Sequence, residues 1–275
     1  MLQTQWSQSV NRRSAIGVYD SGMGGLSVLA ELKKKLPHEH FIYFADTKHL
    51  PYGDKSKEQI ITYSQDIIDW LQHTMKVKMV VVACNTSSTL ALKELSNHFL
   101  VPVVGTIEPL IKGVLARSDI NKLGVIATEA SINSGVHKQR LLESGFAGQI
   151  MPIACPNLVP CIETYPIDWH ELTQWVDQYL APVKATLDSL VYGCTHYPFM
   201  HHIIEQILPQ HVRYFDPAHY IAMEVDTLLM LNGWANDSLD IGSSRFYCSE
   251  DPEGFGKKLQ ALMGLSNISV QLTTF

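Results

Sequence analysis

The 275-residue sequence has few of the features that mark membrane, secreted or nucleic-acid-binding proteins. No apolar run approaches the roughly 20 residues of a membrane span, and the first residues lack the charged and apolar regions of a signal peptide. Lys and Arg number 21 against 27 Asp and Glu, a net charge of −6, which gives no basic footprint for nucleic acid. We therefore predict neither a membrane nor a nucleic-acid partner.

Cysteine is scarce as well. An odd number of cysteines in a chain of this length argues against a disulfide framework, so we expect free thiols and a cytoplasmic location. The spacing of Cys and His lacks a zinc pattern, and no metal is predicted. Residues 1–13 are polar and aperiodic and are predicted to form a flexible N-terminal arm. The five cysteines are Cys84, Cys155, Cys161, Cys194 and Cys248.

Hydrophobic residues make up 46% of the chain, and they fall into short β-branched runs that alternate with amphipathic stretches. This alternation is typical of parallel strands covered on both faces by helices. The strands predicted in the first part of the chain cover 16–19, 41–45, 79–83 and 101–104, and the helices cover 26–36, 56–73 and 86–98.

The pattern then repeats. Leu123–Ile126 echoes Ile16–Tyr19, and the run 190–196 echoes 81–86. Both echoes place a cysteine where a strand meets a helix. We therefore predict an α/β fold of two similar parallel-sheet domains related by pseudo-twofold symmetry, with the active site in the cleft between them.

The predicted domains correspond to these two halves. Residues 218–275 are assigned to the first half, because on their own they would lack a hydrophobic core. The first domain is expected to be discontinuous and to comprise residues 14–110 and 218–275. The second is expected to comprise residues 111–217.

Cys84 and Cys194 are the strongest candidates for chemistry. A cysteine at a helix N-terminus has its thiolate favoured by the partial positive charge there, and the free N–H groups of the first turn suit a carboxylate. Asn85 and Thr86 follow Cys84, while Thr195 and His196 follow Cys194. His196 is placed to tune the second thiol. The alternative is two small buried cysteines with neighbouring helix caps.

The turn Asp20–Gly25 follows a strand and opens a helix, which also suits a dinucleotide fold. Gly22 and Gly24 fit the first two glycines of that motif, but Ser27 stands at the third, and Asp46 lies near the place of a ribose-binding acid. A dinucleotide-dependent oxidoreductase is therefore the alternative function, and a non-catalytic α/β binding protein is a third.

Five segments taken together resemble the glutamate racemases of the aspartate/glutamate racemase superfamily. They occur in the family's order over most of residues 16–198. The segments are IGVYDSGMGGLSVL (16–29), YFADTKHLPYGDKS (43–56), VVACNTSSTLAL (81–92), VPVVGTIEP (101–109) and VYGCTHYP (191–198).

The resemblance implies interconversion of L- and D-glutamate without a cofactor, with D-glutamate supplied for peptidoglycan synthesis. It implies Cys84 and Cys194 as the two acid/base residues, Cys194 acting on L-glutamate and Cys84 on D-glutamate. Asp20 is expected to assist the Cys84 side, and His196 with Glu163 the Cys194 side. The residues expected to hold glutamate are Asp20, Ser21, Tyr52, Gly53, Asn85, Thr86, Ser131, Thr195 and His196.

Two further expectations come from the family. Ser131 stands where the family usually has Thr, a small change in substrate hydrogen bonding. Some members with an N-terminal arm respond to a cell-wall nucleotide precursor, so the resemblance makes such an activator a candidate partner here, and it implies a homodimer as the usual assembly.

Two thiols suit this reaction because racemisation removes the α-proton from one face and returns a proton to the other. The α-carbon is a very weak acid, so preorganised donors must stabilise the developing negative charge when there is no electron sink. One cysteine must be thiolate and the other thiol at the start of each turnover.

Overall fold

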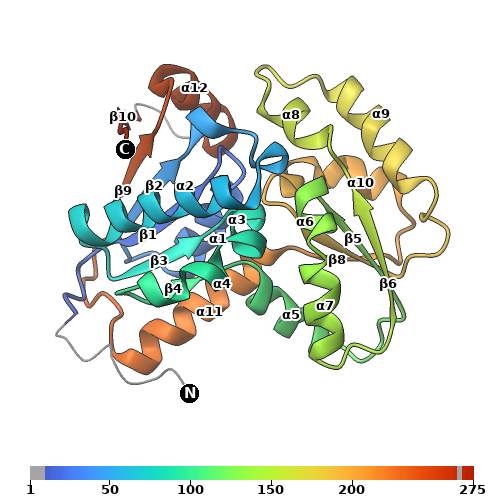
Figure 1. Cartoon of the computed structure of the whole chain (residues 1–275), viewed down its shortest axis with the longest axis horizontal. Helices are drawn as coiled ribbons and strands as arrows, with labels where there is room; N and C mark the ends of the chain where they lie inside the picture. Colours follow the sequence, from blue (N-terminus) through green and yellow to red (C-terminus); the bar gives the residue numbers. More distant parts are fainter. Residues whose placement is uncertain (1–9, 265–267) are drawn as a thin grey trace.

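The computed structural model describes residues 10–264 and 268–275, so positions 1–9 of the predicted N-terminal arm lie outside the described residues. It has two α/β bodies, each built on its own parallel sheet (Figure 1). The six strands of the first sheet lie in the order β10-β9-β2-β1-β3-β4. Their bounds are β1 Ile16–Asp20, β2 Phe41–Ala45, β3 Met79–Val82, β4 Val103–Val104, β9 Ser244–Cys248 and β10 Val270–Leu272.

The second sheet has four strands in the order β6-β5-β7-β8. Its order matches β2-β1-β3-β4 of the first sheet strand for strand, which confirms the predicted repeat of two similar parallel-sheet halves. Strands β9 and β10, from the end of the chain, extend the first sheet beyond this shared core. The bounds of the second sheet are β5 Lys122–Ala127, β6 Gln149–Ala154, β7 Ser189–Gly193 and β8 Arg213–Phe215.

The strand register shows that the two cysteines occupy equivalent places. Tyr19 of β1 pairs with Val82 of β3, and Cys84 comes two residues after Val82. Ile126 of β5 pairs with Tyr192 of β7, and Cys194 comes two residues after Tyr192. In each half, the cysteine therefore follows the carboxyl end of the strand that neighbours the first strand. Ligands bind beyond the carboxyl ends of the strands in open parallel sheets.

Helices connect and cover the strands, and α11 returns the chain from the second sheet to the first. Asp216 caps its N-terminus, since the Asp216 carboxylate accepts a hydrogen bond from Ala218 N, and the helix packs against both α1 and α5 (Figure 1). The bounds are α1 Leu26–Lys35, α2 Lys57–Asp69, α3 Asn85–Leu90, α4 Leu92–Leu95, α5 Ile107–Leu115, α6 Glu129–Asn133, α7 Val136–Glu143, α8 Leu158–Glu163, α9 Trp169–Leu180, α10 His201–Ile207, α11 Pro217–Asn232 and α12 Pro252–Met263.

The predicted single helix over 86–98 is wrong: α3 and α4 are separate and are followed by a 3₁₀ turn. Serine and threonine side chains in α3 hydrogen-bond to the backbone, which competes with helix propagation. Thr89 Oγ1 donates to Thr86 O over 2.9 Å, and Ser88 Oγ donates to Val82 O over 3.1 Å. The strand predicted at 101–104 is shorter than expected, since only Val103 and Val104 belong to it.

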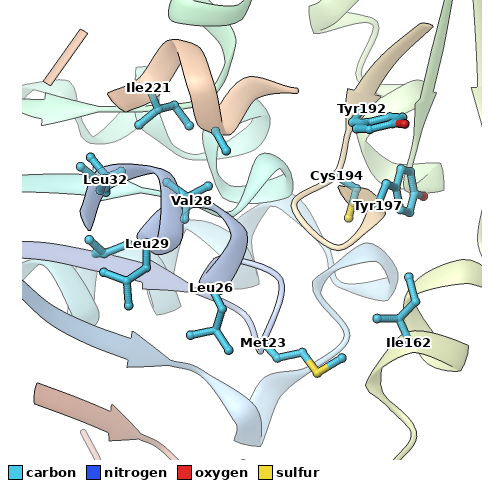
Figure 2. Close-up of a cluster of buried hydrophobic side chains, with 14 of the residues drawn as sticks. Met23, Leu26, Val28, Leu29, Leu32, Ile162, Tyr192, Cys194, Tyr197 and Ile221 are labelled. Atoms are coloured by element: carbon cyan, nitrogen blue, oxygen red, sulfur yellow. The ribbon is translucent and has the colours of Figure 1, made fainter. Parts of the chain in front are cut away.

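A hydrophobic cluster spans both halves and surrounds one of the two cysteines. It joins Leu26 and Leu29 of α1 to Ile162 of α8 and to Cys194. Figure 2 shows Met23, from the turn after β1, extending toward Ile162. Over the described ranges, no helix combines the length and apolar character needed to cross a membrane.

Candidate active site

Cys84 leaves β3, precedes α3, and is only 4% exposed. Its Sγ lies 3.9 Å from Ser21 Oγ in the turn after β1. Burial raises the pKa of the Cys84 thiol to about 12, with a smaller contribution from the Asp20 carboxylate. Hydrogen bonds from Ser87 in the first turn of α3 act in the opposite direction. The expected stabilising effect of the helix end is therefore present, but burial outweighs it in the ligand-free protein.

Cys194 has a different environment. Its Sγ lies 3.5 Å from His196 Nδ1, and His196 Nε2 lies 2.7 Å from Glu163 Oε1. All three side chains are buried. Glu163 is the last residue of α8. This chain from carboxylate to imidazole to thiol is the arrangement that orients a histidine beside a reactive sulfur.

The charged groups beside Cys194 stabilise one another. Burial opposes ionisation of Glu163, but its contacts with His196 and Lys258 outweigh burial and lower the Glu163 pKa to about 2. Burial likewise opposes protonation of His196, but Cys194 and Glu163 outweigh it and raise the His196 pKa well above its ordinary value. Near neutral pH, His196 is therefore an imidazolium that donates from Nε2 to Glu163 and faces Cys194 with Nδ1.

The glycines of the turn after β1 allow the two halves to touch. A Cβ atom at Gly24 would lie 2.3 Å from His196 Nδ1, and one at Gly22 would lie 2.1 Å from Glu163 Oε1. Protein side chains from the second half therefore fill the space that a dinucleotide pyrophosphate needs above such a turn. The glycine pattern that suggested an oxidoreductase is explained by this close contact.

Two further hydrogen bonds join the cysteine-bearing junctions. Thr195 Oγ1 donates to Asp20 Oδ2 over 3.1 Å, and Ser27 Oγ donates to Thr195 O over 2.9 Å. Asp20 is fully buried, and burial raises its pKa. The residue after Cys194 is thereby held against the end of β1, in the half that carries Cys84.

Polar side chains predicted to hold the substrate lie around α3 and α6. Asn85 Oδ1 accepts from Thr106 Oγ1 over 2.6 Å, whereas the buried Asn85 Nδ2 has no partner among the described residues. Thr86 Oγ1 lies 3.2 Å from Thr128 Oγ1, and Thr128 Oγ1 donates to Ser131 Oγ over 3.0 Å. Ser131 therefore connects to Thr86 through Thr128, a residue that the sequence analysis missed.

Tyr52 and Gly53 lie beside the same region. The Tyr52 hydroxyl donates to Asp46 Oδ2, and a Cβ at Gly53 would lie 3.3 Å from Thr128 Cβ. Asp46 also accepts from Ser249 Oγ over 2.7 Å, so its carboxylate organises this loop. The proton of the Tyr52 hydroxyl is therefore used within this loop, and the loop backbone at Gly53 packs against Thr128.

Lys258 on α12 is a second residue that the sequence analysis missed. Its Nζ lies 2.9 Å from Glu163 Oε2. A lysine on an amphipathic helix usually extends into solvent, and no local signal distinguishes Lys258 from Lys257.

These features define a class of protein. The cysteines follow equivalent strands in two halves that contact one another, and hydrogen bonds of Thr195 to Asp20 and Ser27 hold the two cysteine-bearing junctions together. The arrangement suits an enzyme that moves a proton between two thiols, with polar groups between them for a small anion.

The comparisons with known proteins give the family. Residues 23–225 match the Asp/Glu/Hydantoin racemase family, and the chain belongs to that family. It is 40% identical to the glutamate racemase of Picosynechococcus sp. over 90% of this chain and 88% of that protein. The structure of glutamate racemase from Bacillus anthracis superposes with a TM-score of 0.91 at 32% identity, over 96% of this chain and 99% of that one.

A further structure is that of Escherichia coli glutamate racemase in complex with L-glutamate and the activator UDP-MurNAc-ala. It has a TM-score of 0.77 and 27% identity, over 95% of this chain and 98% of that one. Glutamate racemisation is therefore the activity of this chain, and the alternative of an oxidoreductase has no support.

Proposed function

We propose that this chain racemises glutamate by transferring protons through Cys84 and Cys194 on opposite faces of the α-carbon, without a cofactor. The observation that carries this proposal is the equivalent placement of the two buried cysteines in contacting halves. One base reaches one face of a bound amino acid, so two bases on opposite sides allow inversion without turning the substrate.

The two sides differ in how they handle charge. Beside Cys194, the His196 imidazolium stabilises a thiolate, and Glu163 holds the ring in place. Beside Cys84, burial favours the neutral thiol. Proton removal from L-glutamate needs Cys194 as the thiolate and Cys84 as the thiol that returns a proton to the opposite face, and the imidazolium beside Cys194 and the burial of Cys84 favour this combination.

We further propose that the unpaired Asn85 amide donates to a substrate carboxylate. A donor that lacks a partner in a buried site gains a full hydrogen bond when an anion binds. The side chains of Ser21, Thr86, Ser131 and Thr195 and the Gly53 N–H complete the polar lining. Each such donor contributes about 3–4 kcal/mol when it faces developing charge.

The wider role is proposed from the relatives. D-glutamate made here is for peptidoglycan synthesis in the cytoplasm. By likeness to the E. coli structure, UDP-MurNAc-ala is a candidate activator, and a homodimer is the proposed assembly. We also keep residues 14–110 with 218–275, and 111–217, as the proposed domains, because the strands of each sheet come from within one of these sets.

The test is α-proton exchange in D₂O, followed by NMR, with circular dichroism to follow racemisation. In the Cys84→Ser variant we expect racemisation to fall by about 10²–10⁴-fold, while L-glutamate still exchanges its α-proton through Cys194. The Cys194→Ser variant is expected to show the reverse, exchanging only D-glutamate. Normal racemisation in either variant contradicts the two-cysteine mechanism. Cys161→Ser, at a half-exposed cysteine, is the control.

A further inference from the structure

Lys258 connects the first half of the protein to the charged chain beside Cys194. It lies on α12, which follows β9 of the first sheet, whereas Glu163 ends α8 in the second half (Figure 1). The Lys258 Nζ to Glu163 Oε2 distance is 2.9 Å, and the side chains are 23% and 7% exposed. This ion pair is therefore largely shielded from water, unlike the ordinary surface pairs of the protein.

Both oxygens of Glu163 are occupied. Oε1 receives hydrogen bonds from His196 Nε2 over 2.7 Å and from Met23 N over 2.8 Å, and Oε2 receives one from Lys258. Three donors from three different segments fix the plane of the carboxylate. An ionised, fixed Glu163 keeps the proton of His196 on Nε2 and directs Nδ1 at Cys194.

When Cys194 is the thiolate that the proposed mechanism requires, the four groups alternate in charge: Cys194 thiolate, His196 imidazolium, Glu163 carboxylate and Lys258 ammonium. The series is neutral as a whole. Without the ammonium, the remaining three groups carry a net negative charge in a buried site. This loss disfavours the anionic forms of Glu163 and of the Cys194 thiol and raises the pKa of both.

The Cys84 side has no corresponding series. Within residues 10–264 and 268–275, neither Cys84 nor Asp20 forms a hydrogen bond or ion pair with a lysine, arginine or histidine. The Asp20 carboxylate does feel the charges of His196 and Glu163 across the contact between the two halves. Because it touches neither side chain through a hydrogen bond, we expect the influence of Lys258 on ionisation to be much larger at Cys194 than at Cys84.

We propose that Lys258 is a positioning residue for the Cys194 half of the reaction, acting through Glu163 and His196 to hold Cys194 as a thiolate facing L-glutamate. This inference rests on the proposed two-cysteine mechanism. It assigns a role in proton transfer to α12, which lies beyond the region matched by the family and carries no residue that the sequence motifs selected.

Lys258→Met is the informative substitution because it removes the ammonium group and keeps an apolar stem of similar length. Lys258→Arg restores the charge. Lys257→Met is the matched control: Lys257 is the adjacent residue on the same helix, is 62% exposed, and pairs only with Glu253. Thermal unfolding of all three variants checks that the fold is retained.

The first measurement separates the two cysteines. Because L- and D-glutamate are equally stable, kcat/KM is equal in both directions, so α-proton exchange is compared in single-cysteine backgrounds. In Cys84→Ser protein, Lys258→Met is expected to lower exchange of L-glutamate about tenfold near neutral pH. In Cys194→Ser protein, the same change is expected to leave exchange of D-glutamate within about twofold.

The second measurement uses the enzyme with both cysteines. Loss of the positive charge disfavours the Cys194 thiolate, so the acidic limb of the pH profile of kcat/KM is expected to move upward by about 0.5–1 pH unit. Lys258→Arg restores the original profile, and Lys257→Met does not change it.

The outcomes are distinguishable. Equal losses on both sides, with an unmoved pH profile, show a purely structural role and overturn the proposal for Lys258. The proposal is also overturned if Lys258→Met leaves both the pH profile of kcat/KM and the exchange of L-glutamate unchanged. If Cys194→Ser still exchanges L-glutamate, the two-cysteine mechanism itself is wrong, and the proposal for Lys258 falls with it.

Discussion

Thr195 donates a hydrogen bond to the Asp20 carboxylate across 3.1 Å, although 175 residues separate the two in the sequence. Asp20 ends β1 in the half that carries Cys84, and Thr195 directly follows Cys194. The bond therefore links the two cysteine-bearing junctions, between side chains that are both buried. The glycine turn that follows Asp20 makes this approach possible.

Gly24→Ala tests that requirement. The added Cβ would lie 2.3 Å from His196 Nδ1 and 2.6 Å from Thr195 Oγ1, so these side chains or the turn itself must shift and the contact of His196 with Cys194 is disturbed. We expect kcat to fall about 10–100-fold, as small displacements of catalytic groups do, with a smaller effect on thermal stability.

The control is Gly256→Ala in α12, where the nearest atom to the new Cβ is Val270 Cγ2 at 3.7 Å. This change removes a helix-interior glycine without a clash, so it is expected to stabilise the protein by about 0.5–1 kcal/mol and to leave kcat unchanged. Full activity in Gly24→Ala would show that the turn tolerates a side chain and that the contact is not required.

Asn85→Asp replaces the unpaired amide donor with an anion of the same shape. The Oδ1 atom can still accept from Thr106, but the group that faces the site then repels the substrate carboxylate. We expect kcat/KM for both enantiomers to fall at least about 100-fold, with an increase in KM. Steady-state kinetics with each enantiomer provides the measurement.

Gln72→Glu is the matched control for this change. Gln72 is also buried, and its amide nitrogen has no partner in the described part of the chain. Its carbonyl accepts from Leu100 N and Val101 N, before the start of β4. The same amide-to-carboxylate change there is expected to lower stability and to leave KM unaltered. An unchanged KM in Asn85→Asp would remove Asn85 from the substrate site.

The sequence predicts much of this site because most of the site residues lie next to one another in the chain. A β-branched run that ends in Cys84 or Cys194 specifies a strand end, and the two echoes place both cysteines at equivalent positions. The neighbours of each cysteine follow directly in the chain, so Asn85 and His196 are found with them. The repeated strand order has the same local origin.

What the sequence does not predict depends on contacts between distant segments. Lys258 reaches Glu163 only because α12 packs on the first half beside the second. Gly22 and Gly24 look like a phosphate-binding turn, since nothing local shows that His196 and Glu163 fill the space above them. Likewise, the break after Leu90 depends on Ser88, whose hydroxyl donates to Val82 O and accepts from Thr106 N of a more distant segment.

His137 makes the stability of the protein pH-dependent. It is fully buried on α7, neither ring nitrogen has a partner among the described residues, and burial lowers its pKa to about 4. In the unfolded chain the same ring binds a proton below about pH 6.5. The unfolded state is therefore favoured progressively as pH falls from about 6.5 to 4.

Urea unfolding at pH 7 and pH 5 measures this effect. His137 alone is expected to cost about 2 kcal/mol of unfolding free energy between these two values. His137→Phe should remove that part of the loss, whereas His73→Gln, at an exposed histidine, should not. A wild-type and a His137→Phe protein that lose equal stability would show that His137 is protonated when folded.

Lys78 and Glu39 form a buried ion pair below the first sheet, with Nζ 2.6 Å from Oε2 and side chains 0% and 4% exposed. Lys78 also donates to Trp234 O over 2.9 Å, so it joins β3 to the segment after α11. Lys78→Met leaves the Glu39 charge buried and unpaired, which is expected to cost about 3–5 kcal/mol of unfolding free energy.

The double variant Lys78→Met with Glu39→Gln removes both charges and keeps the acceptor for Asn236 N. It should therefore be more stable than Lys78→Met alone, with a coupling of about 1–3 kcal/mol in a double-mutant cycle. Lys57→Met breaks the exposed pair with Glu94 and is expected to cost less than about 1 kcal/mol. If Lys78→Met costs no more than Lys57→Met, the buried pair does not hold these segments together. Because the pair lies before β3, at the opposite end of that strand from Cys84, the folded fraction of every variant should keep its kcat.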